Sequence, residues 1–244
     1  MDMMLMLGIL AAVYFVAFAL ICLYHDKLNI KIGNGVFICL DVVFYFLWNV
    51  GMYQSRWFDD IYDTLKNISP MMFTVIPLTC LMNEKVKNYA YSAIAYLWLG
   101  MLVALFLSPQ SHYANVDTSA NLVYTGEALC HMLASLFGVY LVMTKQVKLS
   151  FANWCRALVF LYAAISWGVL KNFVFHLDHF GMDPYGKYSI YFIDIFGNFY
   201  ATLVGYIFGV LLVVTLGMQS LGLFERLVHS TSEKRGQRAS LEEA

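Results

Sequence analysis

The chain has 244 residues, of which 61% are hydrophobic and only 13% are charged. A soluble domain is about 45–50% apolar and about 25% charged, so this composition excludes an ordinary soluble protein and indicates that lipid surrounds much of the chain. The net charge of −1 disfavours a nucleic-acid partner, because phosphate binding needs a basic surface. The five cysteines are scattered and form no CxxC or Cys/His cluster, so we expect neither a metal nor another cofactor.

Seven apolar runs follow one another along the chain. A spanning helix needs about 20 apolar residues, and runs that do not alternate with period two exclude a membrane β-barrel. The first run lacks a basic start and a small-residue cleavage site, which predicts a retained helix rather than a signal peptide. We therefore predict an all-α, polytopic bundle of seven transmembrane helices, near residues 3–24, 34–53, 69–83, 88–108, 127–144, 154–176 and 189–218.

The basic residues predict the orientation of this bundle. With seven spans, eleven of the 15 Lys and Arg residues fall on the side of the odd-numbered loops and the C-terminus, and three fall on the other side. The remaining one, Lys171, lies within a span. The positive-inside rule then places the N-terminus outside and the C-terminus in the cytoplasm, as in a multi-pass plasma-membrane protein. Residues 1–228 are expected to form one membrane domain, and the polar residues 229–244 a disordered tail.

Polar residues within the predicted spans are candidates for a site, because ionisable groups are costly inside a bilayer. Counted at about 1.5 Å per residue, several of them lie at similar depths in the outer third of the membrane. Asp41 is nearer mid-bilayer and Glu127 nearer the boundary. We infer a polar cavity that opens outward or to the outer leaflet, formed by Asn49, Thr74, His131, Lys171, Asn172, Asp194 and Asn198.

Each candidate also has a structural interpretation. A threonine in a helix usually donates to the carbonyl four residues earlier, so Thr74 alone carries little weight. Pro77 frees the carbonyl of Phe73 beside Thr74, which suits a nucleophile and equally suits a packing kink. Lys171 and Asp194 are expected to neutralise one another. Asp41 is either a proton or cation site or a protonated acid of the core.

An ordered set of short motifs resembles the bacterial YwaF proteins and the related transmembrane protein 164 acyltransferases, and more distantly the androgen-induced threonine hydrolases. The similarity extends from Ser69 to about Met218. The chain differs from these families in carrying Met72 where bacterial relatives often have His, and Thr where transmembrane protein 164 has Cys. The motifs are Ser69-Pro70, Gly100 through Leu107-Ser108-Pro109, Glu127-Ala128-Leu129-Cys130-His131, Gly138 to Leu141, and Lys171-Asn172-Phe173-Val174-Phe175.

The resemblance implies a membrane-embedded acyltransferase or ester hydrolase that acts on a membrane lipid or acyl ester. Thr74 matches the nucleophile and His131 the base. In supporting roles, Lys171 or Asn172 would stabilise the oxyanion, Asp194 or Glu127 would orient the base, and Asn49 and Asn198 would line the site.

Two further function classes stay open. One is a transporter or substrate-binding membrane subunit for a small solute, dependent on Lys171 and Asp41. The other is a non-catalytic seven-helix sensor or partner protein. The sequence does not predict the oligomeric state.

Overall fold

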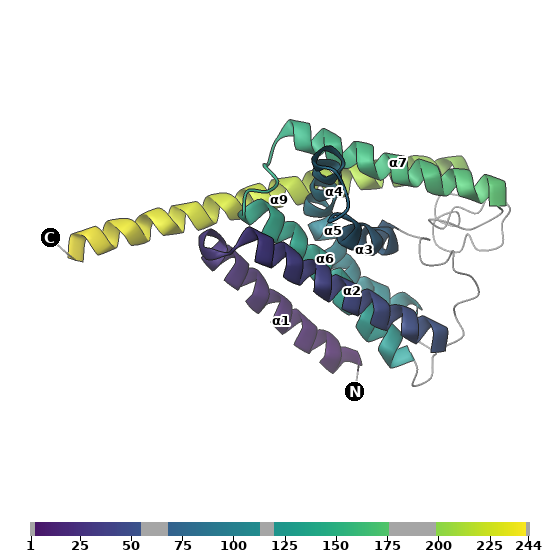
Figure 1. Cartoon of the computed structure of the whole chain (residues 1–244), viewed down its shortest axis with the longest axis horizontal. Coiled ribbons are helices and arrows are strands. Elements are labelled where there is room, and N and C mark those ends of the chain that lie inside the picture. The colour runs from purple at the N-terminus through teal and green to yellow at the C-terminus, as the bar shows by residue number, and fades with distance from the viewer. Residues whose placement is uncertain (1–2, 55–67, 113–119, 176–198, 243–244) are drawn as a thin grey trace.

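The computed structural model describes residues 3–54, 68–112, 120–175 and 199–242. This part of the chain contains no strand, so the all-α prediction is confirmed for it. It consists of a 3-10 turn (His25–Lys27) and eight helices: α1 (Met3–Tyr24), α2 (Ile30–Gln54), α3 (Ile68–Leu78), α4 (Glu84–Tyr96), α5 (Trp98–His112), α6 (Ala120–Met143), α7 (Phe151–Phe175) and α9 (Phe199–Glu242) (Figure 1).

Five of these helices are long and apolar enough to cross a bilayer, namely α1, α2, α6, α7 and α9. The helices α4 and α5 meet at a bend of 47° and make a sixth span if they are counted together. The remaining helix, α3, has 11 residues and covers roughly 16 Å, about half of the hydrocarbon thickness. The chain is therefore a multi-pass membrane protein with five or six spans in its described part, and the predicted count of seven is not confirmed.

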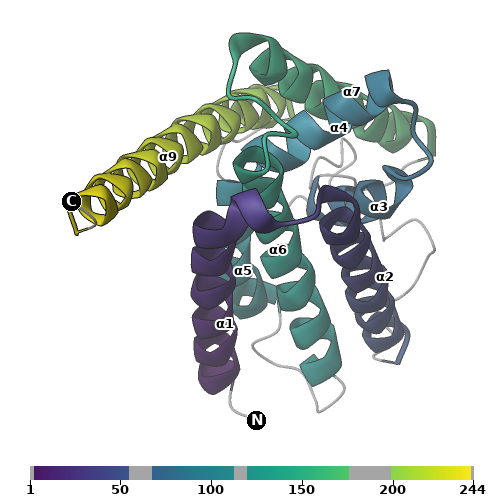
Figure 2. The same cartoon turned by 60° about the vertical axis from the view of Figure 1, so that its left-hand side comes forward.

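The helix α6 lies at the centre of a group of four helices, with α1, α2 and α5 packed directly against it (Figures 1 and 2). Glycines let α2 and α6 approach closely, as is common between membrane helices. A Cβ atom on Gly126 would lie 2.6 Å from the Cα of Trp48, and one on Gly51 would lie 2.8 Å from the backbone nitrogen of Val123. These contacts make the two helices antiparallel.

The bend between α4 and α5 lies where two groups of helices meet. One group is α1, α2, α5 and α6, and the other is α4, α7 and α9. Trp98 Nε1 donates to the carbonyl of Gly217 in α9 at 3.0 Å. The carbonyl of Trp98 accepts from Ser135 in α6 at 2.9 Å, and the Ser135 hydroxyl lies 2.9 Å from that of Tyr14 in α1. The bend is thus hydrogen-bonded directly to α9 and α6, and through Ser135 to α1. The helix α4 also carries most of the packing against α7.

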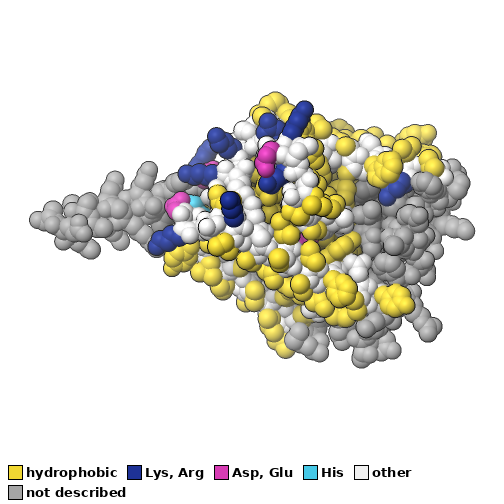
Figure 3. Space-filling model, viewed as in Figure 1, with side chains coloured by type: hydrophobic (Ala, Val, Ile, Leu, Met, Phe, Trp, Pro, Cys, Tyr) yellow, Lys and Arg dark blue, Asp and Glu magenta, His cyan; other side chains and the backbone are white. Residues whose placement is uncertain are grey.

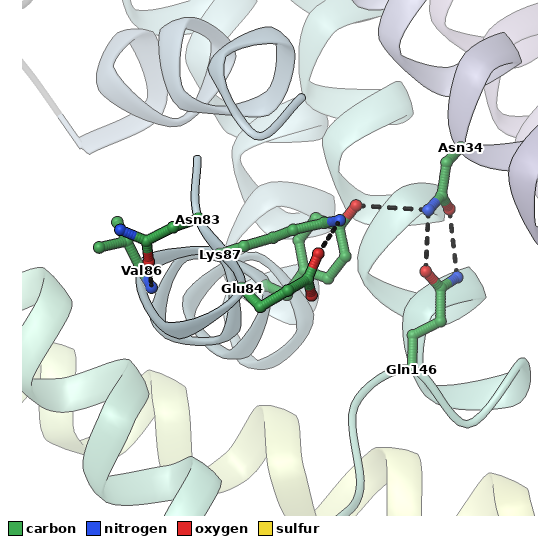
Figure 4. Close-up of polar contacts among 7 residues, drawn as sticks. Asn34, Asn83, Glu84, Val86, Lys87 and Gln146 are labelled. Carbon is green, nitrogen blue, oxygen red and sulfur yellow. Dashed lines mark hydrogen bonds and ion pairs between the residues drawn. The ribbon is translucent and has the colours of Figure 1, made fainter. Parts of the chain in front are cut away.

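A polar network joins the helices at one end of the bundle (Figure 4). Asn34 and Gln146 form a reciprocal amide pair, at 2.9 and 3.1 Å, and Asn34 also donates to the hydroxyl of Tyr91 at 3.3 Å. Lys87 lies over the ring of Tyr91, 5.6 Å from its centre. Most of the Lys and Arg side chains visible in Figure 3 gather toward this end, whereas hydrophobic side chains cover much of the remaining described face. We call it the basic end.

The helix α9 continues through Glu242 and projects well beyond the rest of the body (Figure 1). Residues 229–242 are therefore helical in the structure, although their polar composition led us to expect a disordered tail from residue 229 onward. Several residues of this stretch, including Glu233, Lys234 and Arg235, have good helix propensity, so its polar composition does not oppose a helix.

Candidate functional site

Polar and aromatic side chains meet where α3 packs against α2 and α6. The Thr74 hydroxyl of α3 donates to the carbonyl of Pro70 at 3.0 Å and lies 3.2 Å from the hydroxyl of Tyr45 in α2. The bond to Pro70 is the usual one to the carbonyl four residues earlier. Pro77, in the last turn of α3, therefore does not keep Thr74 away from this bond. The hydroxyl is only partly buried.

His131 of α6 is only 2% exposed and is held by its own helix. Its Nδ1 lies 2.9 Å from the carbonyl oxygen of Glu127. A carbonyl oxygen can only accept, so Nδ1 carries the proton, and Nε2 is the acceptor of the neutral ring. Among the described residues Nε2 has no hydrogen-bond partner. This tautomer is the one that a general base needs.

Phe73 connects the two candidates. Its ring packs edge-on against the ring of His131, with 5.0 Å between the centres, and Phe73 directly precedes Thr74. Among the described residues it also lies near Trp48, at 6.0 Å between ring centres, and Tyr45, at 6.4 Å. The helices that carry Thr74 and His131 thus meet at Phe73, but the hydrogen bonds of the two residues go to other partners.

The other candidates divide into those near this cluster and those away from it. Asn49 donates to the carbonyl of Tyr45 at 2.7 Å, and Glu127 is buried one turn before His131. Lys171 lies on α7, which packs mainly on α4 and α9, so the structure does not bring it to His131. Asn172 is also on α7, but its side chain is outside the described part. Asp194 and Asn198 lie outside the described residues, and so does any pairing of Asp194 with Lys171.

Tyr45, Trp48 and Phe73 also belong to the cluster, although the pattern of polar residues in the sequence did not predict them. A signal was present on α2, where residues 41, 45, 48 and 49 have the spacing of one helix face. Asp41 belongs to the same face and is fully buried. Neither of its carboxyl oxygens, nor Nε1 of Trp48, has a hydrogen-bond partner in the described part of the chain. An ionised carboxylate without a partner is costly at such a position, which makes Asp41 a second point of interest.

Within the described ranges, no three His, Cys, Asp or Glu side chains are grouped so that they could hold a metal ion. What the cluster offers instead is a buried imidazole with a defined tautomer next to a helix that carries a hydroxyl. Such a pair is suited to proton transfer in a dry site. No family model, curated protein or solved structure matches this chain, so its family is a prediction from the sequence motifs alone.

Proposed function

We propose that this protein is an intramembrane acyl-transfer enzyme that acts on an ester of a membrane lipid, with Thr74 as nucleophile and His131 as base. The observation that carries the proposal is the bond from His131 Nδ1 to the Glu127 carbonyl, which leaves Nε2 as a proton acceptor beside α3. In other nucleophile–base pairs a third group orients the base in this way. Here a backbone carbonyl takes that place.

The reaction begins when the Thr74 hydroxyl leaves the Pro70 carbonyl and turns toward His131. Its oxygen attacks the ester carbonyl carbon while Nε2 takes its proton. The alcohol of the lipid then leaves with that proton, and the acyl group remains on Thr74. Water or the hydroxyl of a second lipid attacks the acyl group, again through His131, so that the outcome is hydrolysis or transfer. Tyr45, 3.2 Å from the Thr74 oxygen, positions the hydroxyl in the resting state.

The decisive test measures lipid products by mass spectrometry after the purified protein is incubated with mixed membrane lipids. We expect Thr74→Ala and His131→Ala each to abolish product, because the nucleophile or the base is absent. Thr144→Ala is the matched control, since Thr144 makes the same kind of backbone bond, to the carbonyl of Tyr140 at 2.7 Å, at the end of α6. Full activity of Thr74→Ala would refute the dyad.

We also propose that the chain passes the plasma membrane seven times with its N-terminus outside. Gly51, near the end of α2, packs at the start of α6, whereas Tyr91 of α4 bonds to Asn34 at the basic end. The chain between these helices must therefore return across the bundle, and α3 lies in this return. Tyr53→Cys and Lys145→Cys, each in a cysteine-free background, test the orientation. A membrane-impermeant maleimide added to intact cells should label only the first.

Transport of a small solute or of protons is the second candidate, and it is favoured by the carboxyl of Asp41, which has no hydrogen-bond partner among the described residues. Uptake into proteoliposomes distinguishes the two functions. If Asp41→Asn abolishes uptake and Thr74→Ala does not, the protein is a transporter. If neither variant changes uptake while Thr74→Ala abolishes lipid turnover, the enzyme proposal stands.

A further inference from the structure

A cavity of about 280 Å³ lies between α3, α5 and α9, away from the Tyr45–Thr74 contact. The first residues of α3 and the residues around the α4–α5 bend form one wall, and residues 205–213 in the N-terminal part of α9 form the other. None of the described side chains that line it is charged. The lining is mostly apolar, with two hydroxyl-bearing residues, Ser69 and Tyr206, among Ile68, Gly100, Met101, Gly209, Val210 and Val213.

The cavity is open at Gly209, where a larger residue would place a side chain. A Cβ atom on Gly209 would meet no other heavy atom within 4 Å, so the space beside it is open. A Cβ atom on Gly100 would lie 2.9 Å from Cγ1 of Val213, so Gly100 instead lets α5 and α9 approach closely at the edge of the cavity. The bend of 47° between α4 and α5 sets the course of α5 past α9 at this level. The hollow is therefore a feature of the backbone arrangement and of small residues.

The surroundings determine what fills this space. Residues Leu203–Val228 of α9 form a span of mean hydropathy 2.1, of which only 22% is buried, so lipid chains are the solvent beside the cavity. Water is a poor occupant, since apolar cavities of about 150 Å³ stay dry and accept apolar ligands. An empty space would forfeit the dispersion energy of its lining atoms. Hydrocarbon is thus the available material that best matches the mostly apolar lining.

We propose that this cavity binds one acyl chain of a membrane lipid as a specific site, distinct from the general lipid surface of the protein. The chain enters sideways from the bilayer between α5 and α9, while the polar head group stays outside. Occupancy does not depend on catalysis by Thr74. If the acyl-transfer proposal holds, the site adds a determinant of chain length, because its wall at Ile68 begins only six residues before Thr74 on the same helix.

Photo-crosslinking of the full chain in nanodiscs tests the site. The probe is a phosphatidylcholine with a diazirine on one acyl chain, and the crosslinked peptides are identified by mass spectrometry. We expect labelling at Met101 and Val210, and a loss of at least about fivefold in Gly209→Leu, because the added side chain occupies the space. Gly35→Leu is the matched control, since Gly35 also meets nothing within 4 Å but lies on α2. It should leave the labelling unchanged.

Val213→Phe fills the same cavity from another position and replaces Gly209→Leu if that variant does not fold. Equal labelling of wild type and of the folded filling variants would overturn the proposal, as would labelling spread evenly over lipid-facing residues. The same measurement on Thr74→Ala separates this site from the proposed function. If the crosslinking is normal but neither wild type nor any variant turns over lipid, the acyl-chain site is supported and the enzyme proposal fails.

Discussion

The helices α6 and α9 are both membrane spans, but the protein uses them in opposite ways. The window of α6 has a mean hydropathy of 1.5 and is 94% buried within the protein, whereas that of α9 reaches 2.1 and is 22% buried. The helix α1 is more apolar still, at 2.7, and is 28% buried. In this protein the enclosed helix is less apolar than these two helices at its surface, which is the reverse of a soluble domain.

The reason lies in what drives helices together inside a bilayer. Lipid is as apolar as leucine, so hydrophobicity does not pull a helix inward, and packing and hydrogen bonds decide its place. The helix α6 carries Glu127, His131 and Ser135, which lipid cannot satisfy, and Gly126 and Gly138, which allow neighbouring helices to come close. The helix α9 carries no charged residue between Phe199 and Phe224 and can remain in contact with lipid.

The largest expected effect is at Gly217, where α9 packs closely against the backbone at the end of α4. A Cβ atom on Gly217 would lie 2.1 Å from the carbonyl oxygen of Tyr96, a backbone atom that cannot easily move. We expect Gly217→Val to lower the free energy of unfolding by about 3 kcal/mol or more. Gly8→Val is the control, because Gly8 meets nothing within 4 Å. Thermal unfolding in detergent, followed by size-exclusion chromatography, measures both variants.

A pair of leucine truncations tests the comparison directly. Leu133 of α6 is 3% exposed and Leu212 of α9 is 59% exposed. Leu133→Ala should cost about 2–4 kcal/mol, because the cavity that it leaves lies inside protein. Leu212→Ala should change stability little, because lipid fills the space that it leaves. Equal losses in a chemical unfolding experiment would mean that α9 is covered by protein and not by lipid.

Removal of the unpartnered carboxyl should stabilise the α2–α6 interface. Both oxygens of Asp41 lack a partner in the described part of the chain, so replacing the side chain with leucine should raise the free energy of unfolding by about 1–3 kcal/mol. Asp41→Asn keeps the polarity and serves as the reference. A loss of stability in Asp41→Leu would show that the carboxyl has a binding partner in the membrane. A gain of stability with a loss of function would mark Asp41 as a functional residue.

The smallest effect is expected at the polar network of the basic end. Asn34→Ala removes bonds to Gln146 and Tyr91 and should cost about 1 kcal/mol. A double-mutant cycle with Gln146→Ala should give a coupling energy of similar size, since the two amides bond to each other. Asn88→Ala is the control, because the Asn88 side chain is exposed. Additive losses would mean that the two amides do not stabilise one another.

Much of the helical fold was predictable from the sequence, and the exceptions have physical causes. The predicted runs near residues 3–24, 34–53, 127–144 and 154–176 correspond to α1, α2, α6 and α7. The run near 69–83 contains a helix of only 11 residues, which contains Pro77 near its end. The bend at Leu97 was not predicted, because no proline marks it in the sequence. Hydrogen bonds from Trp98 to α6 and α9 stabilise it instead. The helix beyond residue 228 is consistent with the helix propensity of its residues, which the expectation from polar composition did not take into account.

The candidate site was predictable only in part, because a sequence shows which residues are polar but not which ones meet. Thr74 and His131 were selected from depth and resemblance, and the structure places their helices side by side at Phe73. The partners of the two residues, Tyr45 and the Glu127 carbonyl, follow from how α2, α3 and α6 are packed and turned. Lys171 shared the same expected depth, yet its helix, α7, packs mainly against α4 and α9 and not against α6.

The sequence by itself determined that this protein is a helical membrane protein. The free energy of transfer into lipid depends on the residues of each apolar run, and a helix satisfies the backbone hydrogen bonds of that run. Only the tertiary structure decided that α6 is enclosed, that the α4–α5 bend joins the two groups of helices, and that a cavity opens beside Gly209. These features depend on which faces of the helices meet. That choice is made by close contacts at a few glycines and by hydrogen bonds between residues far apart in the chain.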